Sequence, residues 1–161
     1  MKIFISFLTI WLMLFPTSTN TNAQGTPDAK TKNLIAKTER KIIENEKDWR
    51  LTNKNSSTNT SLNTWKSDKG SIDVTIVIYP TIESARKGLI SMKGTSSKGA
   101  PRDLSGLGDI AFENVFADHP NSIFFVKGTT LVGIQSTLLS KKEEATVERF
   151  ARHILNSLEN K

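Results

Sequence analysis

A hairpin that is apolar on both faces is the feature that most restricts how this chain can fold. Residues 122–126 and 130–137 alternate as strands, and Gly128-Thr129 between them suits a two-residue turn with glycine first. With any two-residue turn, one face carries four large apolar side chains: Ile123, Phe125, Val132 and Ile134. This face is expected to be the core face.

The opposite face of the same hairpin is also apolar. It carries Phe124, Val126, Leu131 and Gly133. A sheet that is apolar on both sides needs cover on both sides. The pattern favours a sheet with helices on each face, or a sheet that takes a partner on one face.

Two further strand regions are predicted. Residues 62–67 and 71–79 form a hairpin through Asp68-Lys69-Gly70, where Gly70 supplies a left-handed conformation. Residues 109–115 form another strand, and a turn at residues 118–121 leads from it into the apolar hairpin.

Three helices are predicted around these strands. The first begins at Thr26-Pro27-Asp28, with Thr26 as its cap, and runs to about Lys47. Thr81 caps a second helix over residues 82–92. The last begins at the capping box of residues 140–143. Its wide apolar stripe comprises Val147, Phe150, Ala151, Ile154, Leu155 and Leu158.

The resulting order, α-β-β-α-β-β-β-α, predicts an α+β fold. We expect a mainly antiparallel sheet of about five strands with helices packed on it, in an α-β-α sandwich. Residues 24–161 are expected to form one domain. The chain has no cysteine, so packing rather than disulfides must hold it together, and thiol, zinc–thiolate and iron–sulfur chemistry are excluded.

Two segments are predicted as loops. Residues 52–64 are almost all Asn, Ser and Thr, and such a tract has little apolar surface to bury. Its sequons at Asn55 and Asn59 are attributed to composition. Residues 93–108 are rich in Gly, Ser and Lys, and a structureless loop of that length is often functional.

The first 23 residues have the order of a secretory signal peptide. Lys2 precedes an apolar run over residues 3–15, Pro16 breaks it, and small polar residues follow up to Ala23. The run is shorter than the roughly 20 residues that a spanning helix needs. We therefore expect cleavage near Ala23-Gln24, a secreted or periplasmic protein, and no transmembrane segment in the mature chain.

The net charge of +6 raises the question of nucleic acid as a partner. Basic residues occur at most in pairs, and acids are interleaved with them, as in Glu39-Arg40-Lys41. That pattern is typical of solvated helix faces. Aromatic and basic residues do not alternate, so nucleic acid is not expected as a partner.

Several short motifs resemble catalytic or cofactor-binding motifs but lack the flanking structure or the companion motifs that such sites require. Residues 106–111 match G-x-G-x-x-A, but a loop leads in and a strand leads out, whereas a dinucleotide site needs strand and then helix. Ser84-Ala85-Arg86-Lys87 resembles an S-x-x-K motif without its companion motifs. His119 and His153 are not spaced as metal ligands. No catalytic residue, cofactor or metal site is predicted.

The predicted binding surface is the 93–108 loop and its end. Lys93, Lys98 and Arg102, with the loop glycines, are candidates to wrap an anionic group, with Arg102 as the main anion contact. Asp109 completes this candidate site, because its side chain is expected to fix the turn at the end of the loop. The partner would be a small anionic ligand or an envelope protein.

Two other functions stay open at the level of sequence. Asp109 and Glu113 lie four apart in a predicted strand, hence on one face, and could serve a small hydrolase together with His119. Alternatively, Phe124 and Leu131 could form the interface of a weak homodimer.

From Trp65 onward the layout resembles a diffuse group of bacterial exported proteins. The similar segments are Gly70-Ser71-Ile72-Asp73-Val74, Ile82-Glu83-Ser84-Ala85, residues 106–112, residues 125–132 and the closing amphipathic helix. These proteins are similar to PsbP-like α-β-α sandwiches and to extracytoplasmic sensor-type domains. The resemblance implies a non-catalytic role, either sensing of a small ligand or docking on an envelope complex. The chain lacks the lipobox cysteine that many of these proteins carry.

Overall fold

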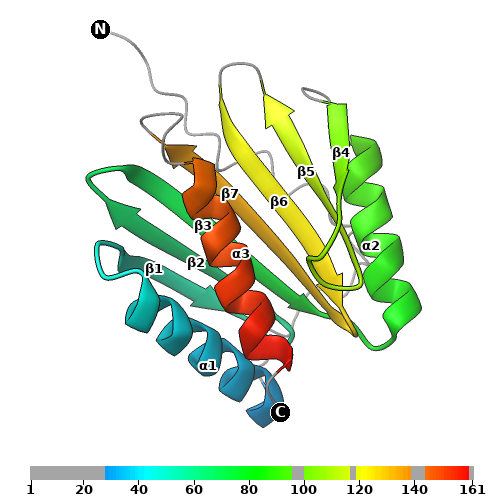
Figure 1. Cartoon of the computed structure of the whole chain (residues 1–161). Helices are drawn as coiled ribbons and strands as arrows, with labels where there is room; N and C mark the ends of the chain where they lie inside the picture. The colour runs from blue at the N-terminus through cyan, green and yellow to red at the C-terminus, as the bar shows by residue number, and fades with distance from the viewer. Residues whose placement is uncertain (1–27, 96–99, 117–118, 139–143, 160–161) are drawn as a thin grey trace, which may run out of the picture.

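A seven-stranded antiparallel sheet forms the centre of the molecule (Figure 1). The structure is a computed structural model that describes residues 28–95, 100–116, 119–138 and 144–159. The strand order is β1-β2-β3-β7-β6-β5-β4, and every neighbouring pair is antiparallel. The α+β class with helices packed on the sheet is confirmed.

The described residues form the three predicted helices but two more strands than predicted. The bounds are α1 Ala29–Asn45, β1 Arg50–Ser56, β2 Thr60–Ser67, β3 Gly70–Ile78, α2 Ile82–Thr95, β4 Ala100–Leu104, β5 Ile110–Phe116, β6 His119–Lys127, β7 Thr130–Leu138 and α3 Glu144–Glu159. No helix in the described part of the chain is long and apolar enough to cross a membrane.

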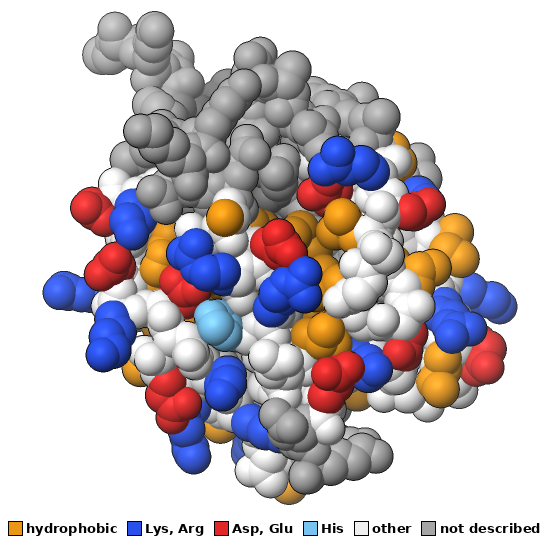
Figure 2. Space-filling model, viewed as in Figure 1, with side chains coloured by type: hydrophobic (Ala, Val, Ile, Leu, Met, Phe, Trp, Pro, Cys, Tyr) orange, Lys and Arg blue, Asp and Glu red, His pale blue; other side chains and the backbone are white. Residues whose placement is uncertain are grey.

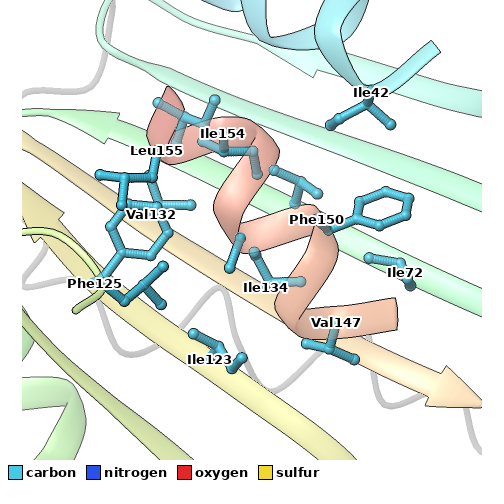
Figure 3. Packing of buried hydrophobic residues seen from close by; sticks show 14 of the residues in the cluster. Ile42, Ile72, Ile123, Phe125, Val132, Ile134, Val147, Phe150, Ile154 and Leu155 are labelled. Carbon is cyan, nitrogen blue, oxygen red and sulfur yellow. The ribbon is translucent and has the colours of Figure 1, made fainter. Parts of the chain in front are cut away.

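Helices α1 and α3 cover one face of the sheet, and α2 packs on the other (Figure 1). The predicted register of the apolar hairpin is confirmed, since Ile123 pairs with Ile134 and Phe125 with Val132 across the Gly128-Thr129 turn. These side chains lie in the larger core, where Phe150 and the other inner residues of α3 meet them (Figure 3).

The other face of the hairpin lies beneath α2. Phe124 and Leu131 are 4% and 0% exposed and pack with Ala85 and Leu89 of that helix. The homodimer predicted through Phe124 and Leu131 is therefore wrong, because the same chain covers these side chains. Thr81 caps α2 as predicted, accepting a hydrogen bond from Ser84 N at 3.1 Å.

Both segments predicted as loops contain strands. The 52–64 tract supplies most of β1 and the first half of β2, which pair from Arg50–Lys66 to Ser56–Ser61. The 93–108 segment contains β4, which pairs with β5. Both extra strands are edges of the sheet, where backbone pairing needs only one neighbour and no apolar alternation. The prediction of about five strands is corrected to seven.

Several predicted boundaries also move. Asp28, not Thr26, caps α1, accepting a hydrogen bond from Thr31 N at 2.6 Å. The first hairpin turns through two residues rather than three, because Ser67 pairs with Gly70. His119 begins β6 rather than lying in a turn. The signal peptide and the capping box at residues 140–143 lie outside the described residues.

Candidate functional site

A hollow opens between the first half of α3 and the end of the sheet that strands β5 and β4 form. Its volume is about 370 Å³, near the lower end of the range of about 300–1,000 Å³ typical of ligand pockets. We call it the α3 hollow. It is lined by Arg102, Leu104, Ser105, Leu107, Glu113, Ile123, Ala145, Glu148 and Arg152. Figure 2 shows apolar side chains at the surface in this region, with acidic and basic side chains beside them.

The segment after β4 makes one wall of the hollow. It turns through Gly106 and Gly108, whose φ angles are +73° and +69°, and it buries Leu107 in the larger core. Asp109 N then donates a 2.7 Å hydrogen bond to Val126 O. A Cβ atom at Gly108 would lie 2.5 Å from that carbonyl oxygen, so this close approach requires glycine.

Glu113 is the buried charge of the hollow. Its side chain is 8% exposed and pairs with Arg102, which is 70% exposed. Arg102 Nε donates to Glu113 Oε1 at 2.6 Å, and Arg102 Nη2 donates to the same oxygen. The pair arises from sheet register, because Arg102 of β4 lies directly opposite Glu113 of β5. The carboxylate is thus deep and the guanidinium is at the rim.

A second ion pair lines the hollow from α3. Arg152 donates through Nε and Nη2 to Glu148 Oε1, at 3.0 and 2.6 Å. The two residues are four apart on one helix face, and each is 55% exposed. The hollow therefore has an apolar floor of Leu104, Leu107 and Ile123 beneath two acids and two arginines.

The three described residues of the predicted binding surface, Lys93, Arg102 and Asp109, do not converge on one site. Arg102 lines the hollow, whereas Lys93 pairs with Asp103 at 2.5 Å, and Asp103 is not among the lining residues. Lys98 lies outside the described residues. Asp109 accepts a hydrogen bond from Gly128 N at 2.7 Å and lies 3.4 Å from Lys127 Nζ, so it fixes the hairpin turn.

Asp109 and Glu113 do not form the carboxylate pair that the strand spacing predicted. Asp109 precedes β5, which begins at Ile110, and each acid has its own partner. The hydrogen bond from Gly128 N, assisted by Lys127, lowers the pKa of Asp109. A carboxylate with a lowered pKa is a poor proton donor near neutral pH. This arrangement gives the hydrolase hypothesis no support.

A second buried acid on the α1–α3 side is held in a closed network. Glu46, 7% exposed, accepts from Arg149 Nε at 2.9 Å and lies 3.3 Å from His153 Nε2. The network joins the end of α1 to α3. In the described part of the chain, no group of three or more His, Cys, Asp or Glu side chains is placed to hold a metal ion.

Sequence reasoning identified Arg102 and Glu113 but missed the rest of the hollow. The Glu148–Arg152 spacing on a predicted helix was a usable signal for one wall. Leu104 and Leu107 were not recognised as residues of the floor, because the 93–108 segment was predicted to be a loop that packs against no other part of the chain.

Comparison with known proteins gives a fold-level likeness. No protein-family model matches the chain, and no curated protein matches its sequence. The crystal structure of a protein from Thermotoga maritima, described as a GTP-binding regulator, is similar with a TM-score of 0.52. The likeness covers 81% of this chain and 90% of that one at 11% sequence identity. At this identity the likeness concerns the fold alone.

Proposed function

We propose that this chain is an exported, non-catalytic binding module that takes a small ligand in the α3 hollow. The observation that carries the proposal is a hollow of about 370 Å³ that combines an apolar floor with a few charged side chains. This combination is typical of small-molecule sites, in which apolar surface gives affinity and a few polar groups fix orientation. The leader-like sequence of residues 1–23 supports the export part of the proposal.

The name of the Thermotoga protein suggests guanine nucleotide as another ligand to consider. In this chain the Gly106–Gly108 turn leads into strand β5, so the phosphates would meet no helix N-terminus there. The hollow also presents Glu113 and Glu148 beside its two arginines, so a triphosphate would meet repulsion along with attraction. A ligand smaller and less anionic than GTP is favoured.

A fragment screen by ligand-observed NMR tests the binding part of the proposal. The mature protein is offered anionic, cationic, zwitterionic and neutral fragments, and GTP, each at millimolar concentration. We expect fragments to bind the native chain and to lose binding in Ala145→Trp, which places an indole in the hollow from an exposed helix position.

The matched control is Ala36→Trp, an exposed alanine on α1 that does not line the hollow. Binding should persist in this control. If no fragment binds, or if Ala145→Trp binds as well as the control, the binding part of the proposal is wrong.

The export part has its own test. N-terminal sequencing of the protein recovered from its native host should begin at Gln24, the residue that follows the expected cleavage site. Recovery from the cell interior with Met1 in place would contradict export.

A further inference from the structure

We propose that the ligand of the α3 hollow is a small zwitterion with an aliphatic body, of which an apolar α-amino acid is the simplest member. The inference rests on the proposed function and names the ligand class of the same site. Three features of the hollow support it: the charges of its lining residues, one carboxylate oxygen of Glu113 without a partner among the described residues, and the aliphatic floor.

Among the described residues, the charges that line the hollow sum to zero. Arg102 and Arg152 contribute two positive charges, and Glu113 and Glu148 contribute two negative charges. A simple anion would bind beside two carboxylates, and a simple cation beside two guanidinium groups, so each would meet repulsion along with attraction. A ligand that carries both charges, separated by a few bonds, can place each against its opposite.

Glu113 has acceptor capacity that the described residues do not use. Both hydrogen bonds from Arg102 go to Oε1, and Oε2 has no hydrogen-bond partner within the described residues. The side chain is more than nine-tenths buried and lines the hollow. An ionised carboxylate has about four lone-pair sites, so Oε2 can accept further hydrogen bonds. An ammonium group, with three donors, would satisfy Oε2 from inside the hollow.

The arginines are placed to receive the opposite end of the ligand. Arg102 and Arg152 are 70% and 55% exposed, so their guanidinium groups stand nearer to solvent than Glu113. Each uses Nε and Nη2 on a carboxylate oxygen of its partner, and neither has an Nη1 hydrogen bond to the described residues. A ligand carboxylate at the rim can take these remaining donors.

The floor determines the body of the ligand. Leu107 and Ile123 are 4% and 3% exposed, Leu104 is half-buried, and none of the described residues that line the hollow is aromatic. An aliphatic body fits such a floor without a stacking partner. The ammonium group is therefore placed at Glu113 and the carboxylate at the arginines, and the aliphatic side chain, which leaves the same Cα atom, lies on the leucines and isoleucine of the floor.

Calorimetric titration with three probes tests the inference. The probes are L-leucine, 4-methylpentanoate, which lacks the ammonium group, and 3-methylbutylamine, which lacks the carboxylate. We expect leucine to bind at least about tenfold more tightly than either, because each analogue loses one charge-assisted contact.

Two variants locate the two charges. Glu113→Gln should weaken leucine about tenfold and leave 4-methylpentanoate unchanged or tighter. Arg152→Gln should weaken leucine and leave 3-methylbutylamine unchanged or tighter. The controls are Glu44→Gln on α1 and Arg50→Gln on β1, which are exposed and outside the hollow and should change no affinity. Arg152 is more than half exposed, so its variant should remain folded and informative even if Glu113→Gln is not.

The inference is overturned if leucine binds no more tightly than the two analogues, or if each variant weakens all three probes equally. Its failure is distinct from failure of the proposed function. Fragments of another class that bind, and that Ala145→Trp excludes, would leave a ligand site without a zwitterionic ligand.

Discussion

Glu46 and Glu113 are almost equally buried carboxylates on the side of the sheet that α1 and α3 cover, but the protein satisfies them to different extents. Glu46 accepts from Arg149 on both oxygens, at 2.9 and 3.3 Å, and has His153 nearby. Glu113 receives both of its hydrogen bonds on one oxygen and lines a hollow. The two acids therefore have similar burial and the same charge, although Glu46 belongs to a closed network and Glu113 to a candidate site. They differ because Glu113 keeps an oxygen without a partner among the described residues and lines the hollow.

The largest effect on the free energy of unfolding should come from the core packing of α3, the helix that contacts Glu46 and also lines the hollow. Phe150 is fully buried and makes edge contacts with Trp49 and Trp65, at 5.5 and 6.0 Å between ring centroids. Phe150→Ala should cost about 3–5 kcal/mol of the free energy of unfolding, measured in urea. Arg152→Ala, on the exposed face of the same helix, should cost less than about 1 kcal/mol. Equal losses would mean that α3 is not anchored as described.

The next effect concerns the wall of the hollow. Gly106 and Gly108 both have positive φ, but only Gly108 has backbone where a Cβ would go. Gly106→Ala should cost about 1 kcal/mol, the typical penalty of the left-handed conformation. Gly108→Ala should cost about 2–3 kcal/mol, because it adds a clash with Val126 O to that penalty. Similar losses in chemical denaturation would contradict the close approach of this wall to β6.

Replacing each acid by glutamine removes its charge, keeps the size of the side chain and shows how much each charge contributes to stability. Glu46→Gln should lower the free energy of unfolding by about 1–2 kcal/mol, a value discounted because Arg149 is half exposed. Glu113→Gln should cost less than about 1 kcal/mol, since one oxygen has no donor to lose among the described residues. Thermal and urea unfolding of both variants check the order. A larger loss for Glu113 would show that its charge serves stability first.

The smallest effect should be that of Asp109 and its pH dependence. Its pKa is lowered by the Gly128 N–H and Lys127, so its ionised form stabilises the fold. That stability is fully present above the unfolded pKa of about 3.9 and is lost as the pH falls through the lower folded pKa. Asp109→Asn should cost about 0.5–1 kcal/mol at pH 7. The difference from the native chain should shrink toward pH 2. A difference that grows on acidification would contradict the conclusion that ionised Asp109 stabilises the fold.

The sequence predicted well those parts of the molecule whose apolar side chains repeat with a clear period. The register of the β6–β7 hairpin and the inner stripe of α3 follow directly from such periods. The edge strand β1 was missed because polar residues dominate it and backbone pairing holds it in the sheet. The edge strand β4 was missed because it is only five residues long and contains Pro101, a residue that is typical of loops and tolerated in edge strands.

The candidate site was only partly predictable, for a related reason. Arg102 and Glu113 were singled out for their charge, but their pairing depends on the register of a strand that sequence reasoning did not find. The hollow also needs the approach of α3, which brings Glu148 and Arg152 from far along the chain. Such long-range placement leaves no local sequence signal.

Methyl and carboxylate NMR during titration with L-leucine can detect the ligand at the floor and at the buried acid of the hollow together. We expect the methyl signals of Leu104, Leu107 and Ile123 and the carboxyl signal of Glu113 to shift together and saturate. The signals of Ile42 and Glu46, which lie outside the hollow, should stay in place. Shifts that centre on Glu46, or none at saturating leucine, would contradict the assignment of the α3 hollow as a zwitterion site.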